Sequence, residues 1–246
     1  MDTSEGPKTS GLQCILLTVT AVGMVLSSTL VTFDASGPGE YITPPGPFFA
    51  IWGLIIALCL GVAALSWWRP NPALMEAIGW PLIVAQLGFS VWLLMAWARS
   101  SVGTVVVFVV ILAALLVAIA RLRAVPPGPG VRLTATALGL YAGWSSAAIW
   151  LNIVTTLPTE IADSPAVQAA GLTGAGLTAA AVLRWLRPSP AYPAAVAWGL
   201  IGVALAAFGG DAWLPMTVAI VDLVVVVILA AANAKADPGW RRSGRT

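Results

Sequence analysis

The sequence has no histidine, and only 9% of its 246 residues are charged. Without histidine the chain cannot build a Ser-His-Asp triad, a His-ligated haem or a histidine proton relay. Its two cysteines, Cys14 and Cys59, lie inside apolar runs and predict buried thiols, with neither a disulfide framework nor a metal site. The sequence shows no recognisable motif that pairs a nucleophile with a general base, so an ordinary enzyme is the least favoured function. A net charge of +2 is too small and too dispersed to indicate a nucleic-acid partner.

Apolar residues, in contrast, are abundant: 59% of the residues are hydrophobic, and the mean hydropathy is +0.92. Charge this sparse could not cover a soluble protein, so the bilayer must be the solvent. Since one span needs about 20 apolar residues, the sequence predicts an all-α membrane protein with about eight transmembrane helices. They are expected at residues 11–32, 47–67, 79–98, 102–122, 132–157, 166–186, 192–209 and 213–234. The seventh is short and interrupted by glycine, and a re-entrant segment is the alternative there.

Positive charge gathers on one side of this topology. Eleven of the 12 Lys and Arg residues fall on the side of the N-terminus, and only Arg99 falls on the other. Cytoplasmic ends retain positive charge, so we expect a multi-pass protein of the cytoplasmic membrane with both termini in the cytoplasm. The N-terminus shows no cleavage site and predicts no removable signal peptide. The basic tail at residues 235–246 is interpreted as a topology anchor, with binding of anionic lipid as the alternative.

The tryptophans sort into two groups by expected depth. One group lies at predicted helix ends, where indole rings favour the headgroup region: Trp67, Trp68, Trp80, Trp185 and Trp213. The other group falls in the outer half of the membrane on the second, third and fifth helices: Trp52, Trp92, Trp97, Trp144 and Trp150. Three helices therefore bring aromatic rings to one level.

Polar residues join these aromatics on two helical stripes. The first steps by 3, 4 and 4 residues along the fifth helix: Tyr141, Trp144, Ala148 and Asn152. The second follows the same spacing on the third helix: Gln86, Ser90, Leu93 and Trp97. Lipid offers such groups no hydrogen-bond partner, so both stripes should turn inward. The alternative is that the polar residues only tie helices together. Trp150 lies outside the stripe on the fifth helix and is interpreted as a packing residue or as part of the interfacial aromatic belt.

Three short motifs carry a resemblance to a known family. The run "TPPGPFFAIWG" (residues 43–53) enters the second helix, and "QLGFSVW" (residues 86–92) lies on the third. The pattern Y-x-x-W-x-x-x-A-x-x-L-N occupies residues 141–152 of the fifth. Over about the first five spans the chain resembles the tryptophan-rich sensory protein family, also called the translocator protein or TspO/MBR family. It departs where Pro47 and Phe48 replace a frequent tryptophan, where Ser90 replaces an asparagine, and where residues 103–116 lack an acid.

The resemblance implies a five-helix bundle, here residues 11–157, that holds a flat tetrapyrrole such as protoporphyrin IX. The family's pocket lies among helices 1, 2, 3 and 5, beneath the loop that joins the first two. By this resemblance and the stripes, the ligand-binding residues are Trp52, Phe48, Gln86, Ser90, Trp97, Tyr141, Trp144, Ala148 and Asn152. Indole faces suit stacking on a macrocycle, and the lack of histidine suits a free-base porphyrin. We therefore expect a protein that senses or handles a hydrophobic planar ligand. Membrane lipids are its other expected partner, and a homodimer is left open.

The remaining chain is expected to add three helices at residues 158–234, with tails at residues 1–10 and 235–246. Small residues on the sixth helix, such as Gly171 and Ala175, permit close helix packing. Asp222 lies near the midplane of the eighth helix, where a charge costs about 2.5–3.5 kcal/mol on insertion scales. The acid either couples protons or donates a hydrogen bond in its neutral form. The alternative function is therefore a proton-coupled transporter of small or lipophilic molecules that uses Asp222, and a structural partner protein is the third.

Overall fold

The computed structural model of the chain describes residues 6–31 and 40–236. Within these ranges no strand occurs, and eight helices are long and apolar enough to cross a membrane. They are α1 (Gly6–Leu30), α2 (Ile51–Trp68), α3 (Pro72–Trp97), α4 (Ser101–Leu122), α5 (Pro129–Val154), α7 (Pro165–Trp185), α8 (Ala191–Gly209) and α9 (Trp213–Ala236). The predicted all-α membrane fold with eight spans is confirmed.

Three short helical segments lie between the spans. The 3-10 turns η1 (Glu40–Ile42) and η2 (Gly46–Ala50) precede α2, and the single turn α6 (Thr159–Ala162) joins α5 to α7. The seventh predicted span forms a continuous helix of 19 residues, α8, rather than a re-entrant segment. All eight expected spans are therefore full helices.

Prolines begin several of these helices. α3 starts at Pro72, well before the predicted residue 79, because Asn71 caps it: the Asn71 Oδ1 accepts a hydrogen bond of 3.1 Å from the Leu74 N–H. Proline fits the first helical position, where its missing N–H has no intrahelical role. Pro129 and Pro165 open α5 and α7 in the same way. The proline-rich breaks in the sequence are thus also helix starts.

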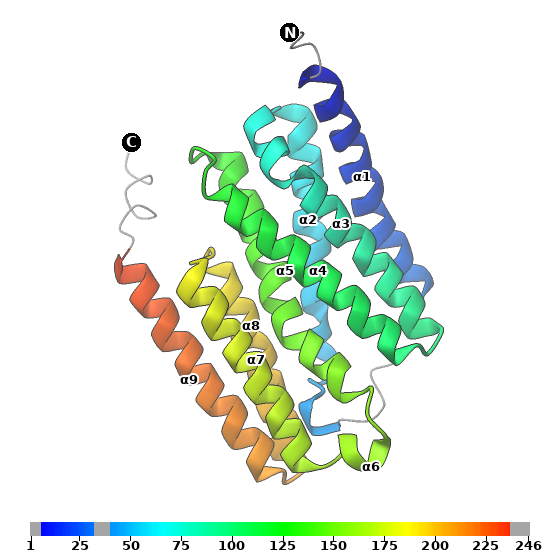
Figure 1. The fold of residues 1–246 in the computed structure, drawn as a ribbon, viewed down its shortest axis with the longest axis vertical. Coiled ribbons are helices and arrows are strands. Elements are labelled where there is room, and N and C mark those ends of the chain that lie inside the picture. Colours follow the sequence, from blue (N-terminus) through cyan, green and yellow to red (C-terminus); the bar gives the residue numbers. More distant parts are fainter. Residues whose placement is uncertain (1–5, 32–39, 237–246) are drawn as a thin grey trace.

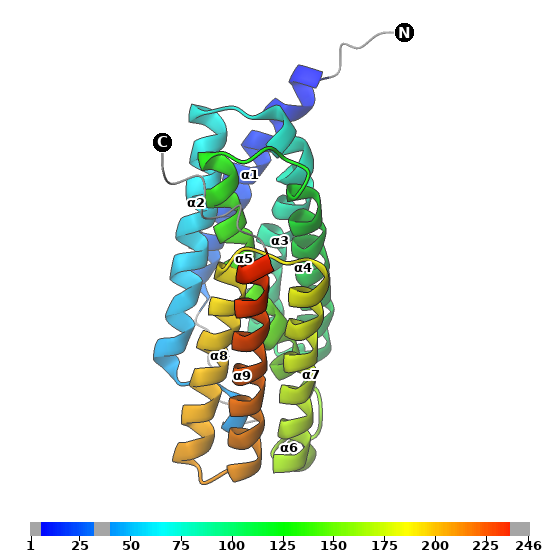
Figure 2. The same ribbon diagram turned by 90° about the vertical axis from the view of Figure 1, so that its left-hand side faces the viewer.

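The helices form one elongated bundle with α5 at its centre (Figure 1). α5 packs against α2 and α4 on one side and against α7 and α8 on the other, while α9 covers α7 and α8. α1 packs on α2 and α3 at the far edge. Figures 1 and 2 place the start of α1 and the end of α9 at the same end of the bundle. This agrees with an even number of spans.

The contact between α5 and α8 is close because glycines line it. A β-carbon on Gly139 would overlap the Ser189 hydroxyl just before α8, and one on Gly143 would overlap the Tyr192 backbone carbonyl of α8. Hydroxyl groups reinforce the contact, since the buried Tyr192 OH donates a hydrogen bond of 2.9 Å to the Ser146 Oγ. Small residues at helix interfaces allow this kind of approach in membranes. α8 is therefore closely packed on α5.

Candidate functional site

A cavity of about 320 Å³ lies beside α5, at the end of the bundle opposite to the start of α1 and the end of α9. We call it the aromatic cavity. Its wall combines residues of α2, α3, α4, α5, α7 and α8 with the segment at residues 42–49. The volume is at the lower end of the range of about 300–1,000 Å³ that is typical of small-molecule sites.

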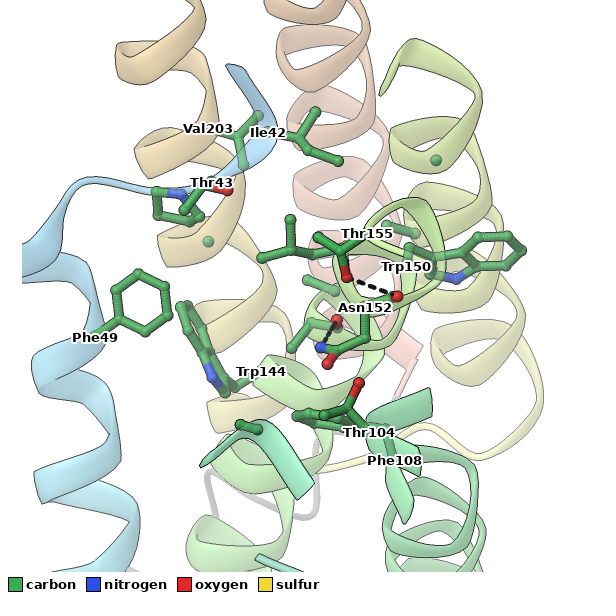
Figure 3. Close-up of a pocket in the computed structure, with 18 of the residues that line it drawn as sticks. Ile42, Thr43, Phe49, Thr104, Phe108, Trp144, Trp150, Asn152, Thr155 and Val203 are labelled. Carbon is green, nitrogen blue, oxygen red and sulfur yellow. Dashed lines mark hydrogen bonds between the residues drawn. The ribbon is translucent and has the colours of Figure 1, made fainter. Parts of the chain in front are cut away.

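Aromatic rings from separate elements form one wall of this cavity. Trp52 of α2 stacks on Trp92 of α3, with ring centroids 5.9 Å apart and an interplanar angle of 29°. Trp144 of α5 meets Trp52 edge-on, with centroids 6.3 Å apart. Phe108 of α4 packs edge-on against Trp92 at 5.2 Å. Phe49 packs edge-on against Trp144 at 5.7 Å (Figure 3). Such edge-to-face and offset pairs are the favoured arrangements of aromatic rings.

A few polar groups interrupt this aromatic wall. The Asn152 Oδ1 accepts a hydrogen bond of 3.3 Å from the Trp92 indole N–H. The Asn152 amide nitrogen donates to the Ala148 carbonyl at 2.8 Å (Figure 3). Asn152 thereby holds the Trp92 ring in place. The indole N–H of Trp144 is buried and has no acceptor among the described residues. A buried donor without a partner costs free energy, so this N–H is available to an acceptor in a ligand.

The rim of the cavity is positively charged and rich in hydroxyl groups. Arg99 follows the end of α3 in the left-handed backbone region, with φ 54°, and lines the rim with Ser100 and Ser101. Its exposed side chain makes no hydrogen bond or ion pair with any residue that the structure describes. Ser100 caps α4 by accepting a hydrogen bond of 3.3 Å from the Gly103 N–H. Since a helix N-terminus carries partial positive charge, this rim favours an anionic group.

The wall facing α5 comes from α7 and α8. α7 contributes Gly171, Leu172 and Ala175, and α8 contributes residues that include Gly199 and Val203. No residue of the described part of α1 reaches the wall. The resemblance implied a pocket among helices 1, 2, 3 and 5, whereas this cavity lacks α1 and adds α4, α7 and α8.

Four of the residues predicted for the site come together at the aromatic cavity: Trp52, Trp144, Ala148 and Asn152. The last three residues of the predicted stripe on α5 therefore face the same cavity. Tyr141, the first member, is fully buried one layer behind. Its hydroxyl donates a hydrogen bond of 2.8 Å to the Ala85 carbonyl, and its ring meets Trp52 edge-on at 5.7 Å. Tyr141 thus supports the aromatic wall from outside the cavity.

The predicted stripe on α3 faces α1 instead of the cavity. The Gln86 Oε1 accepts a hydrogen bond of 2.6 Å from the Thr20 hydroxyl, and Ser90 shares one of 3.1 Å with Ser27. Trp97, on the same stripe, is 73% exposed on the outside of the bundle. For Gln86 and Ser90, hydrogen bonding between helices is the alternative that the structure supports.

Phe48 also lies outside the aromatic cavity. Its ring packs on Trp198 of α8 with centroids 4.6 Å apart, and its carbonyl accepts a hydrogen bond of 2.9 Å from the Trp198 indole N–H. A β-carbon on Gly202 of α8 would overlap the Phe48 ring. Phe48 therefore fastens the segment before α2 to α8.

Several lining residues were not predicted for the site. Trp92 shares the depth of the other outer-half tryptophans but lies off the two predicted stripes. Trp150 was interpreted as a packing residue or as part of the interfacial aromatic belt. Trp150 ties α5 to α7, because its indole N–H donates a hydrogen bond of 2.9 Å to Thr178, and it also lines the cavity. Phe49 and Arg99 carried other interpretations, as part of a family motif and as a topology signal. Only their shared depth could have grouped them with the site.

Asp222 of α9 lies apart from this cavity. Its carboxyl group packs against Gly176 of α7, where a β-carbon would overlap it, and its buried Oδ2 has no partner among the described residues. Cys14 and Cys59 are buried free thiols. Within residues 6–31 and 40–236, no group of three Cys, Asp or Glu residues could hold a metal ion.

Comparisons with known proteins agree with the motifs. The family model described as TSPO-like protein matches residues 13–234, from α1 to α9. Comparisons with curated proteins and with solved structures found no match. The family match thus extends through α7, α8 and α9, beyond the five spans to which the motifs are confined. By this match over most of its length, the chain is a member of the TSPO-like protein family.

Proposed function

We propose that this membrane protein binds a planar hydrophobic ligand of the tetrapyrrole class in the aromatic cavity, in order to sense or handle it. The observation that carries the proposal is the meeting of Trp52, Trp92 and Trp144 at one cavity in which the Trp144 indole N–H lacks an acceptor. Large apolar surfaces with a few oriented polar groups are typical of small-molecule sites. A flat macrocycle offers both a face for the indoles and polar atoms for the N–H.

The charged rim adds a preference within this class. Arg99, beside the first turn of α4, would attract a carboxylate of the ligand while the rings of the macrocycle lie deeper. An acidic porphyrin such as protoporphyrin IX has this combination of a flat apolar body and acidic side groups. We further propose that the site faces the outside of the cytoplasmic membrane, with both termini in the cytoplasm, because the opposite end carries the basic residues.

The test is a titration of the purified protein in detergent with protoporphyrin IX, followed by the absorbance of the porphyrin and by thermal stability. We expect saturable binding to the wild type and a large loss of affinity in the double variant Trp52→Phe with Trp144→Phe. The matched control replaces two exposed tryptophans, Trp67→Phe with Trp185→Phe. Binding that is absent from the wild type, or equally weakened in both double variants, would refute the proposal.

A second candidate function is proton-coupled transport through Asp222. It is favoured by one observation, the buried and unpartnered Oδ2 of Asp222 against Gly176. Against it, Asp222 does not line the aromatic cavity. Uptake of protoporphyrin IX into proteoliposomes under a proton gradient distinguishes the candidates. Equal uptake by wild type and Asp222→Asn would exclude coupling through this residue.

A further inference from the structure

A second cavity, also of about 320 Å³, lies at the other end of the bundle. It is enclosed by the end of α2, the turn at residues 69–71, the start of α3 and the start of α5. Among the residues whose side chains the structure describes, seven Lys and Arg residues lie at this end, at or next to helix ends: Arg69, Arg121, Arg123, Arg132, Arg184, Arg187 and Lys235. We call it the basic-end cavity. It shares no lining residue with the aromatic cavity.

The first turn of α5 presents free N–H groups at this cavity. The first hydrogen bond of the helix runs from the Arg132 N–H to the Gly128 carbonyl, at 2.9 Å. Pro129 has no N–H, and the N–H groups of Gly130 and Val131 donate to no described residue. No side chain caps this helix end. Unsatisfied N–H groups at a helix start, together with the helix dipole, favour an anion.

Thr134 supplies an independent observation one turn further along α5. Threonines within these helices usually donate to the carbonyl four residues earlier, as Thr136 does to Arg132 at 3.0 Å and Thr178 does to Gly174 at 2.8 Å. The Thr134 hydroxyl is fully buried in the wall of the basic-end cavity and has no partner among the described residues. A buried hydroxyl without a partner is rare, so it points to a ligand in this cavity.

Charge completes the description of the site. Arg69 lines the cavity, and its side chain makes no hydrogen bond or ion pair with a described residue, while no acid is found in the lining. The other walls are mostly apolar, with Leu65, Leu74 and Met75 among them. A group that fits must be negatively charged, must accept several hydrogen bonds, and can carry a short apolar attachment.

We propose that the basic-end cavity binds a phosphate group through the Arg69 guanidinium, the N–H groups that begin α5 and the Thr134 hydroxyl. Phosphate offers the multiple acceptor oxygens and the charge that these donors require. The same chemistry occurs in a phospholipid headgroup and in free phosphate.

The experiment titrates the delipidated full-length protein in detergent, at constant ionic strength, with three probes. They are inorganic phosphate, dihexanoyl phosphatidic acid, and dihexanoylglycerol, which has the same acyl chains without the phosphate. We expect phosphatidic acid to raise the unfolding temperature in a saturable way and dihexanoylglycerol to leave it unchanged. A rise with inorganic phosphate as well assigns the site to phosphate in general, and a rise with phosphatidic acid alone assigns it to lipid headgroups. Equal effects of the two lipids, or no effect of any probe, would overturn the proposal.

Variants of the lining residues test whether phosphatidic acid binds in the basic-end cavity. Arg69→Gln should weaken phosphatidic acid binding about two- to fivefold, as for an exposed ion pair. Arg187→Gln, which changes a basic residue at the same end outside the lining, should leave binding unchanged. Thr134→Val keeps the shape of the side chain and removes an unpaired hydroxyl. It should weaken binding about fivefold while the ligand-free protein stays as stable as the wild type or becomes more so. Equal losses in both arginine variants, or a Thr134→Val protein that binds normally, would contradict the assignment.

Discussion

Gly143→Ala tests the close packing of α8 on α5 with a single added methyl group. Its β-carbon would lie 3.0 Å from the Ala195 Cβ and 3.1 Å from the Tyr192 carbonyl carbon, and closer still to the Tyr192 oxygen. The contacted atoms belong largely to the backbone of α8, so the two helices must move apart. Overpacking of this kind costs about 1–3 kcal/mol.

Gly53→Ala is the matched control, because a β-carbon there meets nothing within 4 Å. Replacing glycine by alanine within a helix stabilises by about 0.5–1 kcal/mol, and both variants share this gain. Their difference in the free energy of unfolding therefore isolates the overpacking cost. At roughly 2–4 °C per kcal/mol for a chain of this length, Gly143→Ala should unfold about 2–12 °C below Gly53→Ala. Thermal unfolding in detergent, followed by circular dichroism, measures this difference. Equal unfolding temperatures would show that α8 does not lie against Gly143.

Two further predictions concern the rim and the support of the aromatic cavity. Arg99→Gln should lower the affinity for protoporphyrin IX about two- to fivefold and leave that for its dimethyl ester unchanged, because only the acid carries the carboxylates; binding titrations measure both. Arg187→Gln, whose residue also has a positive φ but lies outside the cavity, is the control, and an equal loss for the ester would contradict the role of charge. Tyr141→Phe should lower the free energy of unfolding by about 0.5–1.5 kcal/mol, because it removes the hydrogen bond to the Ala85 carbonyl. Porphyrin affinity should stay within about twofold of wild type, and a larger loss would show that Tyr141 touches the ligand.

The sequence was sufficient for the membrane class, the eight spans and part of the cavity wall. Long apolar runs define helices in lipid because no other structure satisfies the backbone there. The stripe on α5 was informative because α5 is central, so that a polar face must meet protein on any side. Trp144, Ala148 and Asn152 therefore lie at the cavity, as their spacing suggests.

Helical periodicity did not identify the residues of α3 that face the cavity, because that helix has two candidate faces. Gln86 and Ser90 form a polar stripe, but their partners Thr20 and Ser27 lie on α1. Periodicity shows that residues share a face without showing which neighbour that face meets. Trp92, off the stripe, is the α3 tryptophan that reaches the cavity.

The contribution of α7 and α8 to the cavity could not be predicted from their residues. Gly199 and Val203 of α8 line the cavity, yet glycine and valine in a membrane helix are equally typical of packing and of lipid contact. Gly171 of α7 was interpreted as a packing residue, and it serves in that way against Val154 while it also borders the cavity. Only the arrangement in space separates these roles.

The measurement that most directly tests the central claim is porphyrin binding to a Gly199→Leu variant. A β-carbon on Gly199 makes ordinary contacts, 3.6 Å from the Trp144 ring and 3.8 Å from the Ala147 Cβ, so a larger side chain can enter the cavity from α8. Gly53→Leu, on the outside of α2, is the control. We predict that Gly199→Leu folds with a wild-type unfolding temperature and loses saturable protoporphyrin IX binding, while Gly53→Leu binds as the wild type does. Equal affinity in wild type and Gly199→Leu would contradict a ligand site that α8 completes.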